Sequence, residues 1–133
     1  MKVKVEVLEI EKDDIVLILS GFMSYSNYWC GEVSWKDEEY AEAKARETAL
    51  LEDDDDSVCT EDIMANMLLN GKSLILKDVE GEFEDKELTL VNLLAGLNLS
   101  LKDNLISLDP DDWDAADCDI IIQNAIFNEV VYG

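Results

Sequence analysis

Histidine is absent from this sequence of 133 residues, and proline occurs once. Ten lysine and arginine residues stand against thirty-two aspartate and glutamate residues, so the formal net charge is −22 at pH 7. Nucleic acids and anionic membranes carry the same sign of charge and would repel the chain. No apolar stretch approaches the roughly 20 residues that span a bilayer. We therefore expect no direct binding to nucleic acid and no membrane association.

The missing histidine also removes the side chain that most often serves as a catalytic acid or base. The sequence contains no G-x-x-x-x-G-K-[ST], G-x-G-x-x-G, G-x-S-x-G or H-E-x-x-H motif. A nucleophile at Cys30 or Cys118 would lack an imidazole partner. Among so many acidic residues, pairs of carboxylates arise by chance. We expect no enzymatic activity and no cofactor.

The three cysteines are an odd number without C-x-x-C spacing, which predicts neither a disulfide framework nor a zinc site. The opening segment MKVKVEVLEI alternates apolar with charged residues. A secretory signal would carry an uninterrupted apolar core instead. We expect a cytoplasmic protein with reduced thiols.

Two segments alternate apolar with polar residues, as strands with one buried face do. The first covers residues 3–7. The second runs from Tyr28 to Trp35, with Trp29, Val33 and Trp35 on one side and Cys30, Glu32 and Ser34 on the other. Two further runs, SLILKD and FEDKELTL, flank Gly81 and predict a hairpin.

Helical spacing of apolar residues predicts the remaining elements. Asp13 and Asp14 precede IVLILSGFM, whose residues Ile15, Ile18, Leu19 and Phe22 share a helical face, although its β-branched residues leave a strand open as an alternative. Further helices begin at Thr60, at Thr89 and after Pro110, and the last has Ile121, Ile122, Ala125, Ile126 and Val130 inward. The segment from Lys36 to Leu51 has no clean apolar stripe and is either an exposed helix or a mobile excursion.

Apolar residues make up 48% of the chain, enough to close one core. We predict a single α+β domain over residues 1–133, with a small, mainly antiparallel sheet packed against three to four helices and an acidic, mobile excursion at about 36–58. The expected core residues are Val3, Val5, Val7, Val33, Trp35, Leu94, Leu97, Ile122 and Ile126. Trp29 and Tyr132 are either core aromatics or anchors for a partner.

Aspartates concentrate in the run DDDD and in the segment LDPDDWDAADCD. The candidate partner-binding residues are Asp53, Asp54, Asp55, Asp56, Asp109, Asp111, Asp112, Asp114, Asp117 and Asp119. Hard oxygen ligands suit Ca²⁺, but the EF-hand template fails, because the sixth position after a start at Asp109 is Asp114 instead of glycine and the twelfth is Ile120 instead of glutamate. Weak association with Ca²⁺ stays open as an alternative.

The charge itself suggests a function. A folded chain of this size exposes very roughly 7,000 Å², so the net charge averages about a third of the density of phosphates on duplex DNA. An acidic face of locally higher density would fit the phosphate-binding channel of a nucleic-acid-binding protein. The alternative is a salt-adapted or generally acidic protein with a structural or regulatory protein-binding role.

Three segments carry a family resemblance: NYWCGEV, the run NGKSLILKDVE before the hairpin, and the ending DAADCDIIIQNAIFNEVVYG. They resemble small acidic proteins carried by phages and mobile elements of gut-type Firmicutes, which share a C-terminal pattern near AD-x-IVQYALFGE-[IV]-VYG. This chain departs from that pattern at Asn124, Ile126 and Asn128. The resemblance implies no catalytic residues. It implies an anti-defence role in a bacterial host cell, in which the protein inhibits a CRISPR effector or a restriction enzyme.

Salt adaptation and partner binding predict different responses to ionic strength. If the charge serves a partner, the fold should melt cooperatively well above room temperature in dilute buffer. A salt-adapted fold needs molar salt, because screening must relieve its self-repulsion. Thermal denaturation followed by circular dichroism in dilute buffer and in molar salt tests this, and unfolding in dilute buffer would support salt adaptation.

Overall fold

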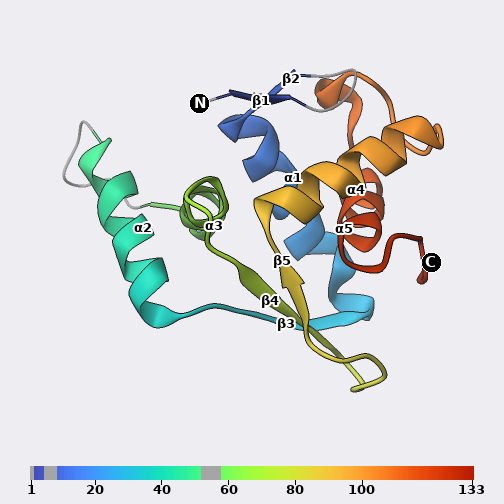
Figure 1. The fold of residues 1–133 in the computed structure, drawn as a ribbon, viewed down its shortest axis with the longest axis horizontal. Coiled ribbons are helices and arrows are strands. Elements are labelled where there is room, and N and C mark those ends of the chain that lie inside the picture. The colour runs from blue at the N-terminus through green and yellow to red at the C-terminus, as the bar shows by residue number, and fades with distance from the viewer. Residues whose placement is uncertain (1, 5–8, 52–57) are drawn as a thin grey trace.

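Five helices lie around a small sheet in a computed structural model, which describes residues 2–4, 9–51 and 58–133 (Figure 1). The helices are α1 (Lys12–Tyr25), α2 (Asp37–Ala49), α3 (Thr60–Leu69), α4 (Leu90–Lys102) and α5 (Ala115–Phe127). Two short 3-10 helices, η1 (Ser26–Tyr28) and η2 (Pro110–Asp112), precede β3 and α5. The α+β class is confirmed, with more helices than expected.

The main sheet is antiparallel and has the order β3-β4-β5. Its strands are β3 (Cys30–Ser34), β4 (Leu74–Asp78) and β5 (Lys86–Leu88). The predicted hairpin joins β4 to β5, and Gly81 adopts a φ of 76° in its turn. The carboxylate of Asp78 accepts backbone N–H bonds from Glu80, Glu82 and Phe83, so it organises this turn.

The amino-terminal strand does not join the main sheet. β1 (Lys2–Lys4) pairs with β2 (Glu9–Glu11) in a separate antiparallel ladder, in which Val3 lies opposite Ile10. β2 was not predicted, because three residues are too few to show a period. Predictions for Val5 and Val7 lie outside the described residues, and so does that for the side chain of Val3.

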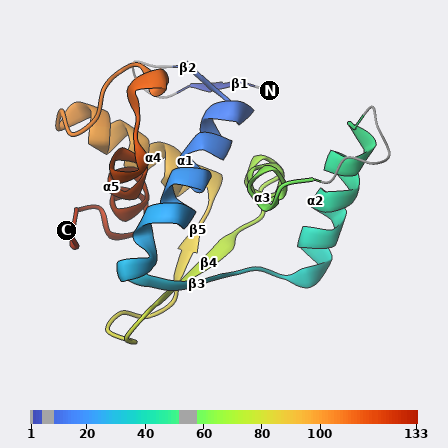
Figure 2. The same cartoon turned by 180° about the vertical axis from the view of Figure 1, so that it is seen from behind.

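The helices form a connected layer. α5 packs against both α1 and α4, while α3 packs between α1 and α2. Figures 1 and 2 show α2 at one end of the molecule, with α4 and α5 on the opposite side of α1. None of the helices in the described ranges has the length and apolar character needed to cross a membrane.

The predicted helical faces are mostly confirmed. The α1 residues Ile15, Ile18, Leu19 and Phe22 are buried, as are Leu97 and Ile122 on α4 and α5. Val33, Trp35, Leu94 and Ile126 are partly buried against this core. The prediction that Val130 faces the core is wrong, because Val130 is 44% exposed. α5 ends at Phe127, and Asn128 turns the backbone away from the helix with a φ of 59°.

Helix starts differ from the prediction by a residue or more. Glu11, not an aspartate, is the N-cap of α1, and Asp14 accepts its backbone N–H at 2.9 Å. Cys59 precedes α3 as its N-cap, so Thr60 is the first residue inside that helix. The helix predicted to begin at Thr89 begins at Leu90, and Thr89 is its N-cap, whose hydroxyl accepts the backbone N–H of Asn92 at 3.2 Å.

The segment after Lys36 is an exposed helix, α2, which buries only Ala43 and Glu47. The carboxylate of Glu47 accepts bonds from Lys12 of α1 and, at 2.8 Å, from Asn66 of α3. At the start of α2, Tyr40 stacks on Trp35 with ring centroids 4.6 Å apart. These contacts link the start and the buried face of α2 to Trp35, α1 and α3. The expected mobility of the excursion at about 36–58 stays a prediction.

α4 and α5 come into close contact at Gly96. A Cβ atom on Gly96 would lie 2.4 Å from the backbone nitrogen of Ala125 and 2.7 Å from the carbonyl oxygen of Ile121. One turn later, Ser100 donates to the carbonyl of Gly96 and accepts from the side chain of Asn124, both at 2.8 Å. The backbones of α4 and α5 are therefore in close contact at Gly96. Buried hydrogen bonds through Ser100 also link the two helices.

Replacing Gly96 with alanine should destabilise the fold by about 2 kcal/mol. Alanine favours a helix interior by about 1 kcal/mol, but overpacking against a backbone that cannot rotate away costs about 3 kcal/mol. Urea unfolding measures the difference, with Ala95→Ser on the exposed side of α4 as the control. A Gly96→Ala variant more stable than the parent would show that propensity outweighs the close contact.

Candidate functional site

Four of the described aspartates of the candidate surface lie in the connection from α4 to α5, and the other two, Asp117 and Asp119, lie on α5. Asp109, Asp111, Asp112 and Asp114 are exposed. The last 31 residues, from position 103 onward, contain no lysine or arginine. This end of the molecule therefore presents carboxylates without cationic residues from its own segment. Asp53, Asp54, Asp55 and Asp56 lie outside the described residues.

Several of these aspartates also shape the backbone. Asp109 accepts the backbone N–H of Asp111 at 3.0 Å, and Asp112 accepts the hydroxyl of Ser107 at 3.2 Å. Asp114 and Asp117 form a capping box at the start of α5, with reciprocal bonds of 2.9 and 3.1 Å. Helix initiation thus accounts for part of the aspartate content. The same bonds hold the carboxylates in fixed positions.

Asp119 does not belong to the exposed surface that the sequence predicted. Asp119 is only 4% exposed, because the beginning of α5 places it beneath η1. Its carboxylate accepts hydrogen bonds from the indole of Trp29 at 2.7 Å, the hydroxyl of Tyr28 at 2.8 Å and the hydroxyl of Ser26. The side chain of Gln123, one turn further along α5, donates a fourth bond at 2.9 Å.

The cluster around Asp119 is made of neutral donors. Hydrogen bonds to a charged acceptor contribute about 1.5–3 kcal/mol each, so four of them offset much of the cost of burying a carboxylate. Three of the donors lie in η1 or directly after it, namely Ser26, Tyr28 and Trp29, whereas Asp119 and the fourth donor, Gln123, lie on α5. The carboxylate therefore joins segments that are about 90 positions apart in the sequence.

Gln123 extends the cluster to the last residues of the chain. Its side-chain oxygen accepts the backbone N–H groups of Val131 and Tyr132, both at 2.8 Å. Tyr132 then stacks on Trp29, with ring centroids 5.5 Å apart and planes within 2° of parallel. Trp29 is thus a core aromatic, and Tyr132 packs on it. The sequence held one signal of this contact, the spacing of Asp119 and Gln123 by one helical turn.

The environment changes the titration of nearby groups. Burial, the hydrogen bond to Asp119 and its negative charge raise the pKa of the Tyr28 phenol above its usual value. Burial and the neighbouring carboxylates of Asp117 and Asp114 raise the pKa of the Cys118 thiol to about 11. Both groups therefore stay protonated near neutral pH. A thiol in that state is a poor nucleophile.

The acidic residues that the structure describes do not gather on one face. Exposed carboxylates also occur on α2 and in the β4–β5 connection, at Asp37, Glu38, Glu42, Glu80, Glu82, Glu84 and Asp85. α2 lies on the opposite side of α1 from α5, and the hairpin turn projects away from both (Figures 1 and 2). The structure therefore does not bring α2 and the strand-edge glutamates together with Asp109 to Asp114 as one surface.

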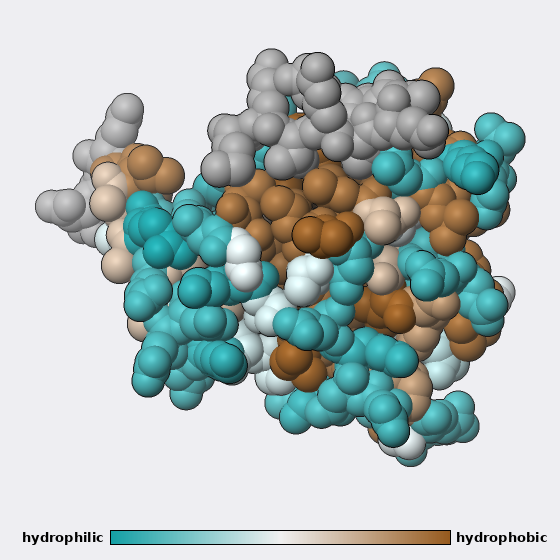
Figure 3. Space-filling model, viewed as in Figure 1, coloured by the Kyte–Doolittle hydropathy of each residue, from teal (hydrophilic) through white to brown (hydrophobic). Residues whose placement is uncertain are grey.

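Figure 3 shows hydrophilic residues over α2 and around the hairpin, with a hydrophobic area between α3 and α4. The accessible surface is 7504 Å². Divided by the net charge of −22, this gives about one net charge per 340 Å², against roughly one phosphate per 100 Å² on duplex DNA. The average charge density of the surface is thus about a third of that of duplex DNA.

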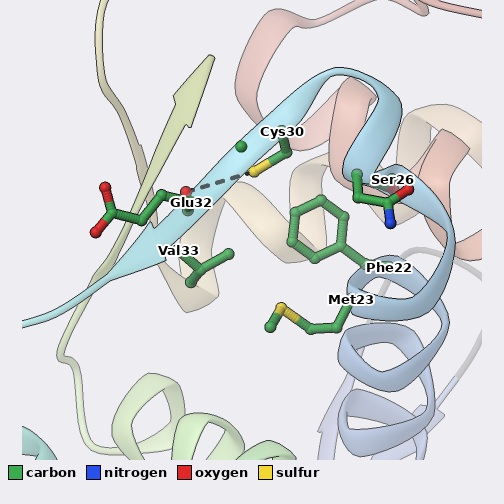
Figure 4. A pocket seen from close by; sticks show the side chains of 8 residues that line it. Phe22, Met23, Ser26, Cys30, Glu32 and Val33 are labelled. Atoms are coloured by element: carbon green, nitrogen blue, oxygen red, sulfur yellow. Dashed lines mark hydrogen bonds between the residues drawn. The ribbon is translucent and has the colours of Figure 1, made fainter. Parts of the chain in front are cut away.

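A pocket of about 150 Å³ lies between the end of α1 and β3. Figure 4 shows the side chains of Phe22, Met23, Cys30 and Val33 converging on it, while Glu32 points away. A bulge between Cys30 and Glu32 produces this arrangement, because the extra residue puts Cys30 and Val33 on the same side of the strand. The predicted alternation, with Cys30 opposite Val33, is therefore wrong at this point.

The bulge depends on Gly31. A Cβ atom there would lie 2.8 Å from the Cα atom of Val79, so the two backbones approach too closely for a side chain. Cys30 is buried, and its thiol donates to the carbonyl of Glu32 at 3.5 Å. Burial raises the pKa of this thiol. The thiol of Cys30 is thus not an activated nucleophile. The pocket has apolar walls at Phe22, Met23 and Val33, and Ser26, Asn27 and Glu32 are its polar lining residues.

Among the described residues, no group of three or more cysteine, aspartate or glutamate side chains is arranged to hold a metal ion. In comparisons with protein-family models, with curated proteins and with solved structures, no match to this chain was found.

Replacing Asp119 with alanine should lower the free energy of unfolding by about 4 kcal/mol, because removing one partner leaves buried donors without an acceptor. Urea unfolding followed by the fluorescence of the buried indole of Trp29 measures the loss. Asp111→Ala removes the same charge from an exposed position and is the control. Equal stability of the two variants would show that the buried carboxylate does not hold α5 to η1.

Proposed function

We propose that the chain is a non-enzymatic acidic protein that binds and inhibits a nucleic-acid-binding protein of a bacterial host, a CRISPR effector or a restriction nuclease. Exposed carboxylates would occupy the channel in which that protein binds phosphates. The charge of −22 exceeds the magnitude of about 2–8 that suffices to keep a small domain soluble. The negative charge beyond that needed for solubility supports a role in binding a cationic surface.

One observation carries the proposal: Asp109, Asp111, Asp112 and Asp114 are exposed in a short, hydrogen-bonded segment at the start of α5. Their backbone is ordered by the caps, so a partner need not order it on binding. A channel lined by lysine and arginine releases its own counter-ions on contact with such an array. Long-range attraction also speeds association at low salt.

The dispersal of the other carboxylates favours a second candidate, a generally acidic or salt-adapted protein. Charges on α2, the hairpin and the α4–α5 connection lie on different sides of the molecule. Such dispersal reduces repulsion between clusters and does not form a single stripe. Dependence of the fold on molar salt would favour this candidate over a binder.

Neutralising Asp109, Asp111, Asp112 and Asp114 to asparagine should weaken binding to the host protein by about 30-fold. Exposed charges contribute on the order of 0.5 kcal/mol each, and asparagine preserves the N-cap acceptors. The partner is first recovered from a host lysate and tested for release by duplex DNA. Affinities of the purified pair are then measured by titration calorimetry at several salt concentrations.

The matched control removes four charges from the hairpin by Glu80→Gln, Glu82→Gln, Glu84→Gln and Asp85→Asn. This variant has the same net charge as the first variant but keeps the aspartates at the start of α5. It should therefore retain at least a third of the parent's affinity. Equal losses for both variants would assign binding to net charge alone. Affinity that is independent of salt, or a partner that DNA does not displace, would contradict the proposed mimicry of nucleic acid.

A further inference from the structure

β3 has a free edge in the sheet that the described residues form. The strand lies at the end of the order β3-β4-β5 and pairs there with β4 alone. Gly31 and Glu32 in the middle of β3 are exposed. An exposed strand edge offers backbone N–H and C=O groups to which another extended chain can hydrogen-bond. This edge is therefore suited to strand addition.

The pocket beside β3 supplies a place for a side chain. Its volume of about 150 Å³ lies between β3 and the end of α1, and an apolar cavity of about that size holds one benzene ring. Phe22, Cys30 and Val33 give it an apolar wall, while Met23 at its mouth is 40% exposed. It is the right size for one aliphatic side chain.

The bulge relates the pocket to the free edge. Because Cys30 and Val33 point to one side of β3, the pocket opens on that side of the sheet. Side chains of an added strand also alternate between the two sides. Every second residue of such a strand therefore faces the side on which the pocket lies. Backbone pairing and insertion of one side chain are compatible in a single binding mode.

The negative charge of the chain indicates which kind of segment binds at the free edge of β3. A second copy of this chain would bring another net charge of −22 to the same edge, and like charges disfavour the contact. The side chain of Glu32 on the edge strand is 61% exposed and already lies 3.7 Å from Lys77. A segment that carries lysine or arginine between apolar residues complements this surface.

We infer that the free edge of β3 binds an extended, basic segment of another protein by strand addition, with one apolar side chain of that segment in the pocket. This contact is distinct from the aspartates at the start of α5. It requires backbone hydrogen bonds, so it is specific for an extended chain and is not a general attraction between opposite charges.

The test uses the full chain and the peptide KVKVKLKVKVK, which alternates lysine with apolar residues. Two further peptides of the same sequence carry N-methyl groups either on every lysine or on every apolar residue. In an extended strand the N–H groups of alternate residues point to opposite edges, so only one of the two methylated peptides should bind as the parent peptide does. The other should bind at least about tenfold more weakly, and the difference is measured by calorimetry.

Met23→Glu separates apolar insertion from charge. The added negative charge should strengthen general attraction to a basic peptide, whereas loss of the apolar contact at the pocket mouth should weaken strand addition about tenfold. Leu17→Glu is the matched control, because Leu17 is exposed on α1 and does not line the pocket. Circular dichroism verifies that both variants are folded.

Hydrogen exchange supplies the third measurement. The parent peptide should slow exchange of backbone amides between Gly31 and Ser34, and the weaker methylated peptide should not. Equal binding of both methylated peptides, or tighter binding to Met23→Glu than to the parent protein, would overturn the inference. Self-association of the chain in sedimentation experiments, with protection of the same amides, would instead assign the edge to a second copy.

Discussion

The carboxylate of Asp119 is the constraint on which the arrangement of η1, α5 and the final residues depends. Four neutral donors surround it, and no cation is among them. A buried charge that relies on hydrogen bonds alone has few acceptable geometries, because each lost bond leaves a desolvated group. The side chains of Ser26, Tyr28 and Trp29 must therefore meet the first turns of α5. Trp29 in turn supplies the ring on which Tyr132 stacks.

Several other acidic residues have a different role from that of Asp119. At the start of α5 and in the hairpin turn, aspartate side chains accept backbone N–H groups that would otherwise lack partners. One residue type thus organises the backbone and places negative charge at the surface. A partner that reads this charge would meet carboxylates held by local bonds. The proposed recognition therefore depends on a few capped segments more than on the total charge.

Local patterns in the sequence predicted the helix faces and the hairpin well, because the apolar spacing of residues such as Ile15, Ile18 and Leu97 reflects one period. The bulge at Gly31 was not predictable, since it depends on the approach of Val79, which directly follows β4. Nor was the burial of Asp119, which looks like one aspartate among many until Trp29 and Ser26 are placed beside it. Long-range polar contacts leave little trace in a single sequence. The distribution of the acidic residues over different sides of the molecule, and the pocket beside β3, likewise have no local sequence pattern.

The attachment of α2 has a consequence for the dynamics of the molecule. α2 buries little apolar surface, and its contacts with the rest run through α3, the stacked pair Trp35 and Tyr40, and the polar contacts of Glu47. A helix held in this way opens at a lower free energy than the whole domain unfolds. We therefore expect α2 to form a smaller cooperative unit, less stable than the unit that contains α1, α4 and α5. Detachment of the smaller unit would expose the apolar surface of α3 while α1, α4 and α5 remain packed.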